Sequence, residues 1–174
     1  AELLHKLSIF PDEFNRRAID IATPRCARAL IRRMFYHSRF EILKTPLVHR
    51  SKYSLSKFGV DHDVYKKKVV LKFMKKLDQY SREVCARENC ELSDEYVMPM
   101  VARYNADESR VYREEAQFKG FGQYKYLVVV IAGDRSLQQA ILHEYFAGRD
   151  EEKVTVYANM ILKALEHMHT QGLI

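Results

Sequence analysis

The sequence predicts an α+β fold, in which an antiparallel sheet is combined with amphipathic helices. Two apolar runs have the composition of buried strands, Lys68 to Met74 and Tyr126 to Ile131. A third segment, Glu151 to Gln171, has apolar residues at helical spacing and acidic residues in its first turn, and Gly172 follows it. Strands and helices are therefore expected within one chain of 174 residues, a length that suits one or two domains.

The composition is that of a globular protein with a basic surface. Hydrophobic residues make up 47% of the chain, and its formal net charge of +6 favours polyanionic partners such as nucleotide phosphates, nucleic acid or a membrane surface. The sequence has no apolar run long enough for a membrane helix and no signal-peptide pattern, so we expect a cytoplasmic protein. Its three cysteines form no CxxC pair, which argues against a zinc site or a disulfide framework.

Residues 1–50 form the first of three predicted regions and are expected to be basic and mostly helical. Pro24 separates two short helices, and the second runs from about Arg25 to Met34. The first helix, with the sequence AIDIA, and the second together resemble the closing part of an ankyrin repeat. The region is thus expected to be either the end of an ankyrin array or a plain amphipathic helical pair. Residues 44–51, which include Pro46, are predicted to be a linker.

The second predicted region, residues 51–131, is organised around one lysine and one glutamate. Lys72 lies within an apolar strand, where an ammonium group needs either a nearby anion or a path to solvent. Asp78 is placed to cap the helix that follows, and Glu83 lies beside the apolar stripe of that helix. The sequence therefore predicts that Lys72 and Glu83 can meet.

This strand and helix resemble the third strand and the following helix of the protein kinase N-lobe, with VVLK, ending at Lys72, in place of the family's V-A-I-K. In that family the lysine holds the α- and β-phosphates of the nucleotide and the glutamate orients it, so the resemblance implies these roles for Lys72 and Glu83. It also implies strands from Tyr53 to Phe58 and around Val64, joined by a turn at residues 59–63 that covers the nucleotide.

The expected nucleotide-covering turn departs from the family's G-x-G-x-x-G pattern. Residues 57–64 contain one glycine, Gly59, while Asp61 and Asp63 add negative charge near any phosphate. We therefore expect ATP to bind weakly, with little dependence on magnesium and with an affinity similar to that of adenosine.

Residues 126–137, with the sequence YLVVVIAGDRSL, resemble the fifth strand, the hinge and the start of the next helix of a kinase. The resemblance implies that Val129 controls access to the back of the nucleotide pocket, and that the backbone of Val130 to Ala132 contacts adenine. Ser136 is predicted to cap a helix from Leu137 to Glu144.

The resemblance implies a kinase N-lobe, with a five-stranded antiparallel sheet and one helix, followed in residues 132–174 by the hinge and the first helices of a C-lobe. The strand at Tyr126 to Ile131 is expected to pair antiparallel with one around Val101 to Tyr104. Residues 105–123 are expected to form a long, polar and exposed connection between them.

The catalytic-loop aspartate and the magnesium-binding D-F-G motif of kinases do not occur in this sequence. The chain is therefore expected to be a fragment of a longer protein, with no catalytic or metal-binding residue of its own. ATP binding with magnesium, and phosphorylation of serine or threonine in an unknown protein substrate, are expected only of the complete parent protein.

Two other functions fit parts of the sequence. A pseudokinase would use the same fold as a scaffold for a protein partner. The segment KGFGQYKY, residues 119–126, matches much of the RNA-recognition-motif signature, although Gln123 stands where that family has a base-stacking aromatic residue. The RNA-binding alternative predicts that Phe121 and Tyr126 lie on an open face of the sheet.

Overall fold

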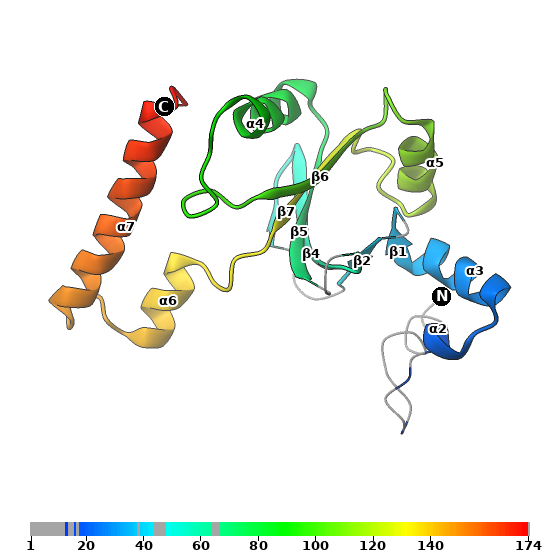
Figure 1. Ribbon diagram of the computed structural model, residues 1–174, viewed down its shortest axis with the longest axis horizontal. Coiled ribbons are helices and arrows are strands. Elements are labelled where there is room, and N and C mark those ends of the chain that lie inside the picture. Colours follow the sequence, from blue (N-terminus) through cyan, green and yellow to red (C-terminus); the bar gives the residue numbers. More distant parts are fainter. Residues whose placement is uncertain are drawn as a thin grey trace.

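The computed structural model describes residues 18–37, 39–43, 48–63 and 67–173, together with Glu13 and Arg16. This described part is an α+β structure, as predicted from the sequence. Its strands form one seven-stranded antiparallel sheet in the order β1-β2-β4-β5-β7-β6, and β3 pairs with β4 (Figure 1).

The strands are β1 (Phe35–Tyr36), β2 (Phe40–Ile42), β3 (His49–Arg50), β4 (Ser54–Asp61), β5 (Lys67–Met74), β6 (Met100–Asn105) and β7 (Tyr126–Ile131). The helices are α2 (Ala18–Ile21), α3 (Pro24–Met34), α4 (Leu77–Asn89), α5 (Arg110–Phe118), α6 (Leu137–Glu144) and α7 (Glu151–Thr170). Helix α4 connects β5 to β6 and α5 connects β6 to β7, while α6 and α7 follow the sheet. The pairing of β6 with β7 agrees with the expectation from the sequence.

Side chains of the central strands alternate between the two faces of the sheet. On one face, Met74, Tyr126 and Val128 pack against Tyr80 and Val84 of α4. All five side chains are at most 5% exposed. Helix α4 therefore closes this end of the face with a small apolar cluster.

The opposite face carries a larger, aromatic cluster. Phe73 of β5 packs there with Tyr36 of β1 and Tyr112 of α5. The ring of Phe73 stacks on Phe121 with 4.3 Å between the ring centroids, and it meets Tyr36 edge to face at 5.4 Å. Because aromatic rings bury large apolar areas in specific geometries, this face holds the main hydrophobic core.

Helix α5 lies within the connection that was expected to be polar and exposed. Its first turn is capped by Ser109, whose Oγ accepts a hydrogen bond from the Tyr112 amide at 3.2 Å. Tyr112 and Ala116 are buried, and Glu115 Oε1 accepts a hydrogen bond from the His37 amide at 2.7 Å. The expectation was wrong because most charged residues of this segment lie on the outer side of a short amphipathic helix.

The first fifty residues contain strands as well as helices. Helix α3 begins at Pro24, which suits a first turn because its missing amide hydrogen is not needed there. After Met34 the chain enters the sheet through β1 and β2, which corrects the expectation of helix for Phe35–Tyr36 and Phe40–Ile42, and β3 follows at His49–Arg50. Residues 14–15, 17 and 44–47 lie outside the described residues, so the ankyrin resemblance and the linker stay predictions.

Strand β4 is continuous where two strands and a turn were expected. It pairs with β5 along its whole length, so Gly59 lies in the middle of a strand. A Cβ atom at Gly59 would lie 2.4 Å from Leu71 Cδ1 and 2.7 Å from the carbonyl oxygen of Glu41. Glycine is therefore required here by the close approach of neighbouring groups and not by a turn. The strand expected around Val64 lies outside the described residues.

Asp61, at the end of β4, is paired with an arginine. Its side chain is 1% exposed and accepts hydrogen bonds from Arg39 Nε and NH2 at 2.8 and 2.7 Å. These hydrogen bonds hold the pKa of Asp61 below its usual value. Asp61 thus joins the chain before β2 to β4, which corrects its expected place in a nucleotide-covering turn.

Helices α6 and α7 begin and end close to the predicted residues. Ser136 and Gln139 form a reciprocal cap at the start of α6, with hydrogen bonds of 3.2 Å from the Gln139 amide to Ser136 Oγ and 2.9 Å from the Ser136 amide to Gln139 Oε1. Helix α7 ends before Gly172, whose φ of 70° suits glycine. Within the described residues, no helix combines the length and the apolar character needed to cross a bilayer.

Helix α7 is attached to other segments near both of its ends. Near its C-terminal end, the Ser93 amide donates to His167 Nε2 at 3.0 Å and the Glu91 amide donates to Gln171 Oε1 at 3.2 Å. Near its start, Lys153 forms an ion pair with Glu144 of α6. The helix therefore connects the loop after α4 with α6.

Candidate functional site

The predicted contact between Lys72 and Glu83 is present. Lys72 lies in β5 on the face that α4 covers, and its Nζ donates a hydrogen bond to Glu83 Oε2 of α4. The Lys72 side chain is 38% exposed, whereas that of Glu83 is 15% exposed. The ammonium group is therefore fixed by a carboxylate and still accessible from solvent.

Helix α4 holds Glu83 in place with a second cation. Arg87, one turn later, lies 3.5 Å from Glu83 Oε1 and donates to the Glu83 carbonyl oxygen at 3.1 Å. The helix begins at Leu77, so Asp78 lies in the first turn and is not the expected cap. Its carboxylate still interacts favourably with the helix dipole there.

A cavity of about 410 Å³ lies beside the ion pair; we call it the Lys72 cavity. Its lining comes from β4, β5 and α4 and consists of Ser54, Lys72, Met74, Gln79, Arg82 and Glu83. Two cations and one carboxylate give the lining an excess of positive charge. The cavity therefore suits an anionic ligand.

The turn between β3 and β4 lies at the edge of the Lys72 cavity. Ser51 Oγ accepts hydrogen bonds from the amides of Tyr53 and Ser54 at 3.3 and 3.0 Å. Lys76 Nζ lies 4.0 Å from the centroid of the Tyr53 ring, which fastens the turn to the residue before α4. Residues 51–54, and not the expected turn at residues 59–63, thus form the turn at this cavity.

Val129 does not face the Lys72 cavity. In the register of β5 and β7, Val128 lies opposite Lys72 and Val130 lies opposite Val70, so these residues share one face. Val129 packs in the aromatic cluster on the other face. The role expected for Val129 is thereby corrected, because a shift of one residue along a strand reverses the face.

The backbone expected to contact adenine is partly used within the structure. The amides of Ile131 and Ala132 donate to the carbonyl oxygens of Pro99 and Lys68 at 3.1 and 3.0 Å. These two amides therefore form hydrogen bonds within the structure, and they are not available to a ligand. The chain leaves the sheet after them, at Gly133.

The aromatic residues of the RNA-recognition-like segment are not displayed together. Tyr126 is 4% exposed and stacks on Tyr80 of α4 at 5.0 Å between ring centroids. Phe121 packs against Phe73 on the opposite face of the sheet. The open stacking surface that the RNA-binding alternative predicts is thus contradicted for these two rings.

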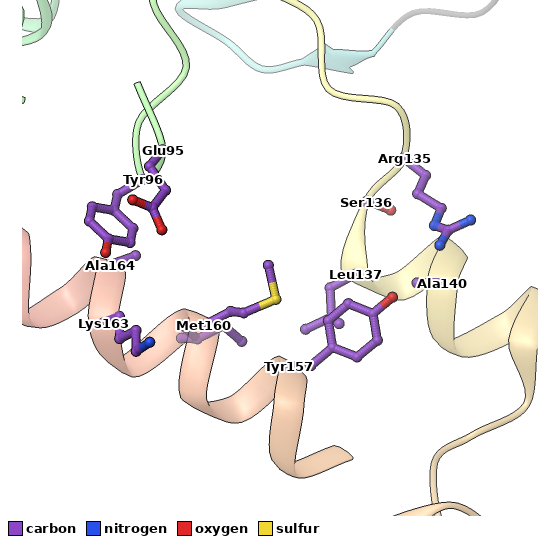
Figure 2. A pocket seen from close by; sticks show the side chains of 11 residues that line it. Glu95, Tyr96, Arg135, Ser136, Leu137, Ala140, Tyr157, Met160, Lys163 and Ala164 are labelled. Atoms are coloured by element: carbon purple, nitrogen blue, oxygen red, sulfur yellow. The ribbon is translucent and has the colours of Figure 1, made fainter. Parts of the chain in front are cut away.

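A second cavity, of about 370 Å³, lies between α6, α7 and the loop after α4 (Figure 2). Figure 2 shows Met160 of α7 pointing into the space between Tyr96 and Tyr157. Leu137 and Ala140 of α6 complete a largely apolar wall. Several apolar residues of α7 are exposed, and Met160 and Ile161 among them line the cavity: Val154, Val156, Met160, Ile161, Leu162 and Leu165.

The sequence analysis identified the ion pair but not the other residues of the Lys72 cavity. Gln79, Arg82 and Glu83 are spaced so that they share one side of α4, and this helical periodicity is visible in the sequence. The contribution of Ser54 depends on the pairing of β4 with β5, which places Ser54 opposite Met74. Such a register is not encoded in any local pattern.

Comparisons of the chain with protein-family models, with curated proteins and with solved structures give no significant match. Among the described residues, no group of three or more histidine, cysteine, aspartate or glutamate side chains is placed to hold a metal ion. The Lys72 cavity and its surroundings therefore provide the basis for a functional proposal.

Proposed function

We propose that the chain is the nucleotide-binding lobe of a protein kinase-like domain with the first helices of a second lobe, and that Lys72 binds the phosphates of ATP. The observation that carries the proposal is the ion pair between Lys72 and Glu83. It joins a central strand to the helix over it and holds a partly exposed ammonium group at the wall of a positively charged cavity. Such a group binds phosphate oxygens by charge-assisted hydrogen bonds.

The topology around the ion pair supports this proposal. Strand β7 pairs antiparallel with β6, as expected of the kinase-like lobe, and also with β5 on its other side. Helix α4 connects β5 to β6 and packs on one face of the sheet. Strands β1 and β3 and helix α5 are additions to the five strands and one helix that the resemblance implies.

We assign the adenine base to a surface next to Lys72. Phe58, Val70 and Val130 lie side by side on neighbouring strands, on the same face as Lys72, and all three are half-buried. Lys68 Nζ lies over the Phe58 ring, 4.2 Å from its centroid, so Val70 and Val130 provide the partly open apolar surface that suits a planar base. The backbone from Gly133 onward leaves the sheet at this end, so we assign the polar contacts with adenine to it.

The part of the proposed site that would hold the phosphates carries less negative charge than the sequence indicated. Asp61 is paired with Arg39 and does not repel phosphate in a covering turn. The turn at the cavity, residues 51–54, carries Lys52 instead of a carboxylate. We therefore expect ATP to bind more tightly than adenosine, contrary to the expectation from the sequence.

Phosphoryl transfer by a kinase needs a catalytic aspartate and magnesium ligands, and the motifs that supply them do not occur in this sequence. With a catalytic aspartate and magnesium ligands supplied by a longer chain, the lobe would present ATP for phosphorylation of serine or threonine. The pseudokinase alternative is favoured by the exposed apolar side chains of α7, which offer a surface for a protein partner. Both forms of the proposal use the same nucleotide site.

Calorimetry on the purified chain tests the nucleotide site. We expect Lys72→Ala to weaken ATP binding by about tenfold to a hundredfold, because one charged hydrogen bond contributes roughly 1.5–3 kcal/mol, and to leave adenosine binding unchanged. Lys125→Ala is the control, since Lys125 is an exposed lysine 3.8 Å from the carboxylate of Asp107. Equal ATP affinities for the two variants, or no binding of ATP or adenosine to the unaltered chain, would falsify the proposal.

A further inference from the structure

We infer that Arg82 is a second phosphate-binding residue of the Lys72 cavity, so that its ligand carries a chain of two or three phosphate groups. The inference rests on the proposed nucleotide site and specifies its ligand class as nucleoside diphosphates and triphosphates. Arg82 belongs to α4 and lines the same cavity as Lys72.

The contacts that Arg82 makes within α4 are weak. Its NH2 group lies 3.4 Å from Asp78 Oδ2, and the two side chains are 77% and 65% exposed. Its Nε donates to the Asp78 carbonyl oxygen at 3.3 Å. Ion pairs between exposed side chains contribute little to stability, so the guanidinium group can exchange Asp78 for a ligand at small cost.

The other charged residues of the cavity wall are already paired with each other. Lys72 is bound to Glu83, and Glu83 also lies beside Arg87. Asp78, the partner of Arg82, is not part of the cavity lining. The excess positive charge of the cavity is therefore that of Arg82, whose planar group can donate two parallel hydrogen bonds to one phosphate.

The two cations come from different elements, Lys72 from strand β5 and Arg82 from helix α4. A ligand that fills the cavity is therefore expected to meet both of them. Gln79 of α4 adds an uncharged amide to the same wall, and Ser54 of β4 adds a hydroxyl group that lies 2.9 Å from Ser51 Oγ. A single phosphate uses part of this lining, whereas a diphosphate or triphosphate uses both cations.

The test compares phosphate chains of different length by calorimetry in the presence of EDTA. The probes are AMP, ADP, ATP, adenosine and inorganic tripolyphosphate, and the variant is Arg82→Ala. We expect it to weaken binding of ATP and tripolyphosphate about tenfold and of AMP less than about twofold. Arg110→Ala is the matched control, because Arg110 is an exposed helical arginine with a carboxylate partner four residues away, Glu114 at 2.7 Å.

The outcomes separate this inference from the proposed function. If ATP binding depends on Lys72 but Arg82→Ala and Arg110→Ala behave alike, the inference is overturned and the nucleotide site stands. If tripolyphosphate binding depends on Arg82 while adenosine does not bind and ATP binds no more tightly than tripolyphosphate, the cavity binds phosphate chains and the nucleotide proposal fails. Circular dichroism confirms that each variant is folded.

Discussion

The two faces of the central sheet are built from the same strands but differ in character. One face packs against α5 and against Tyr36 of the edge strand β1, and its core combines aromatic rings with aliphatic side chains of the central strands. The other carries a smaller apolar cluster under α4, an ion pair and the Lys72 cavity. Adjacent residues such as Lys72 and Phe73 thus belong to different environments. A substitution of Phe73 should affect mainly the stability of the fold, whereas a substitution of Lys72 should affect mainly ligand binding.

The largest expected effect is on the aromatic face. Phe73→Ala should lower the free energy of unfolding by about 3–5 kcal/mol, because it removes a fully buried ring that stacks on Phe121 and contacts Tyr36. Urea unfolding followed by circular dichroism measures the loss, with Phe73→Leu as a control that keeps most of the volume. A loss below about 1 kcal/mol would mean that the main core lies elsewhere.

A smaller and pH-dependent effect is expected from Asp61, which lies on the same side of β4 as Leu55 of the aromatic cluster. Because Arg39 lowers the pKa of Asp61 in the folded state, this pair stabilises the fold above the ordinary aspartate pKa of about 4 and loses its effect as the pH falls through the folded value. Asp61→Asn should therefore cost about 1–3 kcal/mol at pH 7.

The pH profile distinguishes this origin from a simple packing defect. When the pH falls from about 6 to about 3, a range that includes the ordinary aspartate pKa, the free energy of unfolding should decrease more for the unaltered chain than for Asp61→Asn. Denaturant titrations at several pH values measure the difference. Parallel profiles for the two proteins would show that the bond from Arg39 to Asp61 adds nothing to folding.

The smallest effect on stability is expected at the ion pair itself. Glu83→Gln should change the free energy of unfolding by less than about 1 kcal/mol, because Lys72 is 38% exposed and the amide can still accept a hydrogen bond. The same variant should weaken ATP binding, since Lys72 is no longer held by a carboxylate. A destabilisation as large as that of Phe73→Ala would remove the contrast between the two faces.

Sequence analysis succeeded where local patterns are strong. The apolar run of β5, the spacing in α7 and the cap at Ser136 each carry their information within a few residues. The meeting of Lys72 and Glu83 could be predicted because a strand followed directly by an amphipathic helix folds back on itself. The fold class and the centre of the site were accessible for the same reason.

The remaining features depend on long-range packing. Gly59 was taken for a turn residue because glycine is typical of turns, whereas its cause is the closeness of Leu71 and Glu41. Helix α5 has few apolar residues and is stabilised by contacts with β1, far away in the sequence. The face to which Val129 points depends on a strand register, and an error of one residue reverses it.

The attachment of α7 at both ends has a mechanical consequence. A helix of 20 residues is a rod about 30 Å long, and its length hardly changes under load. Because one end is bound to the loop after α4 and the other to α6, α7 acts as a strut between them. The spacing between that loop and α6, which line the second cavity together with α7, is therefore set by the length of a rigid helix.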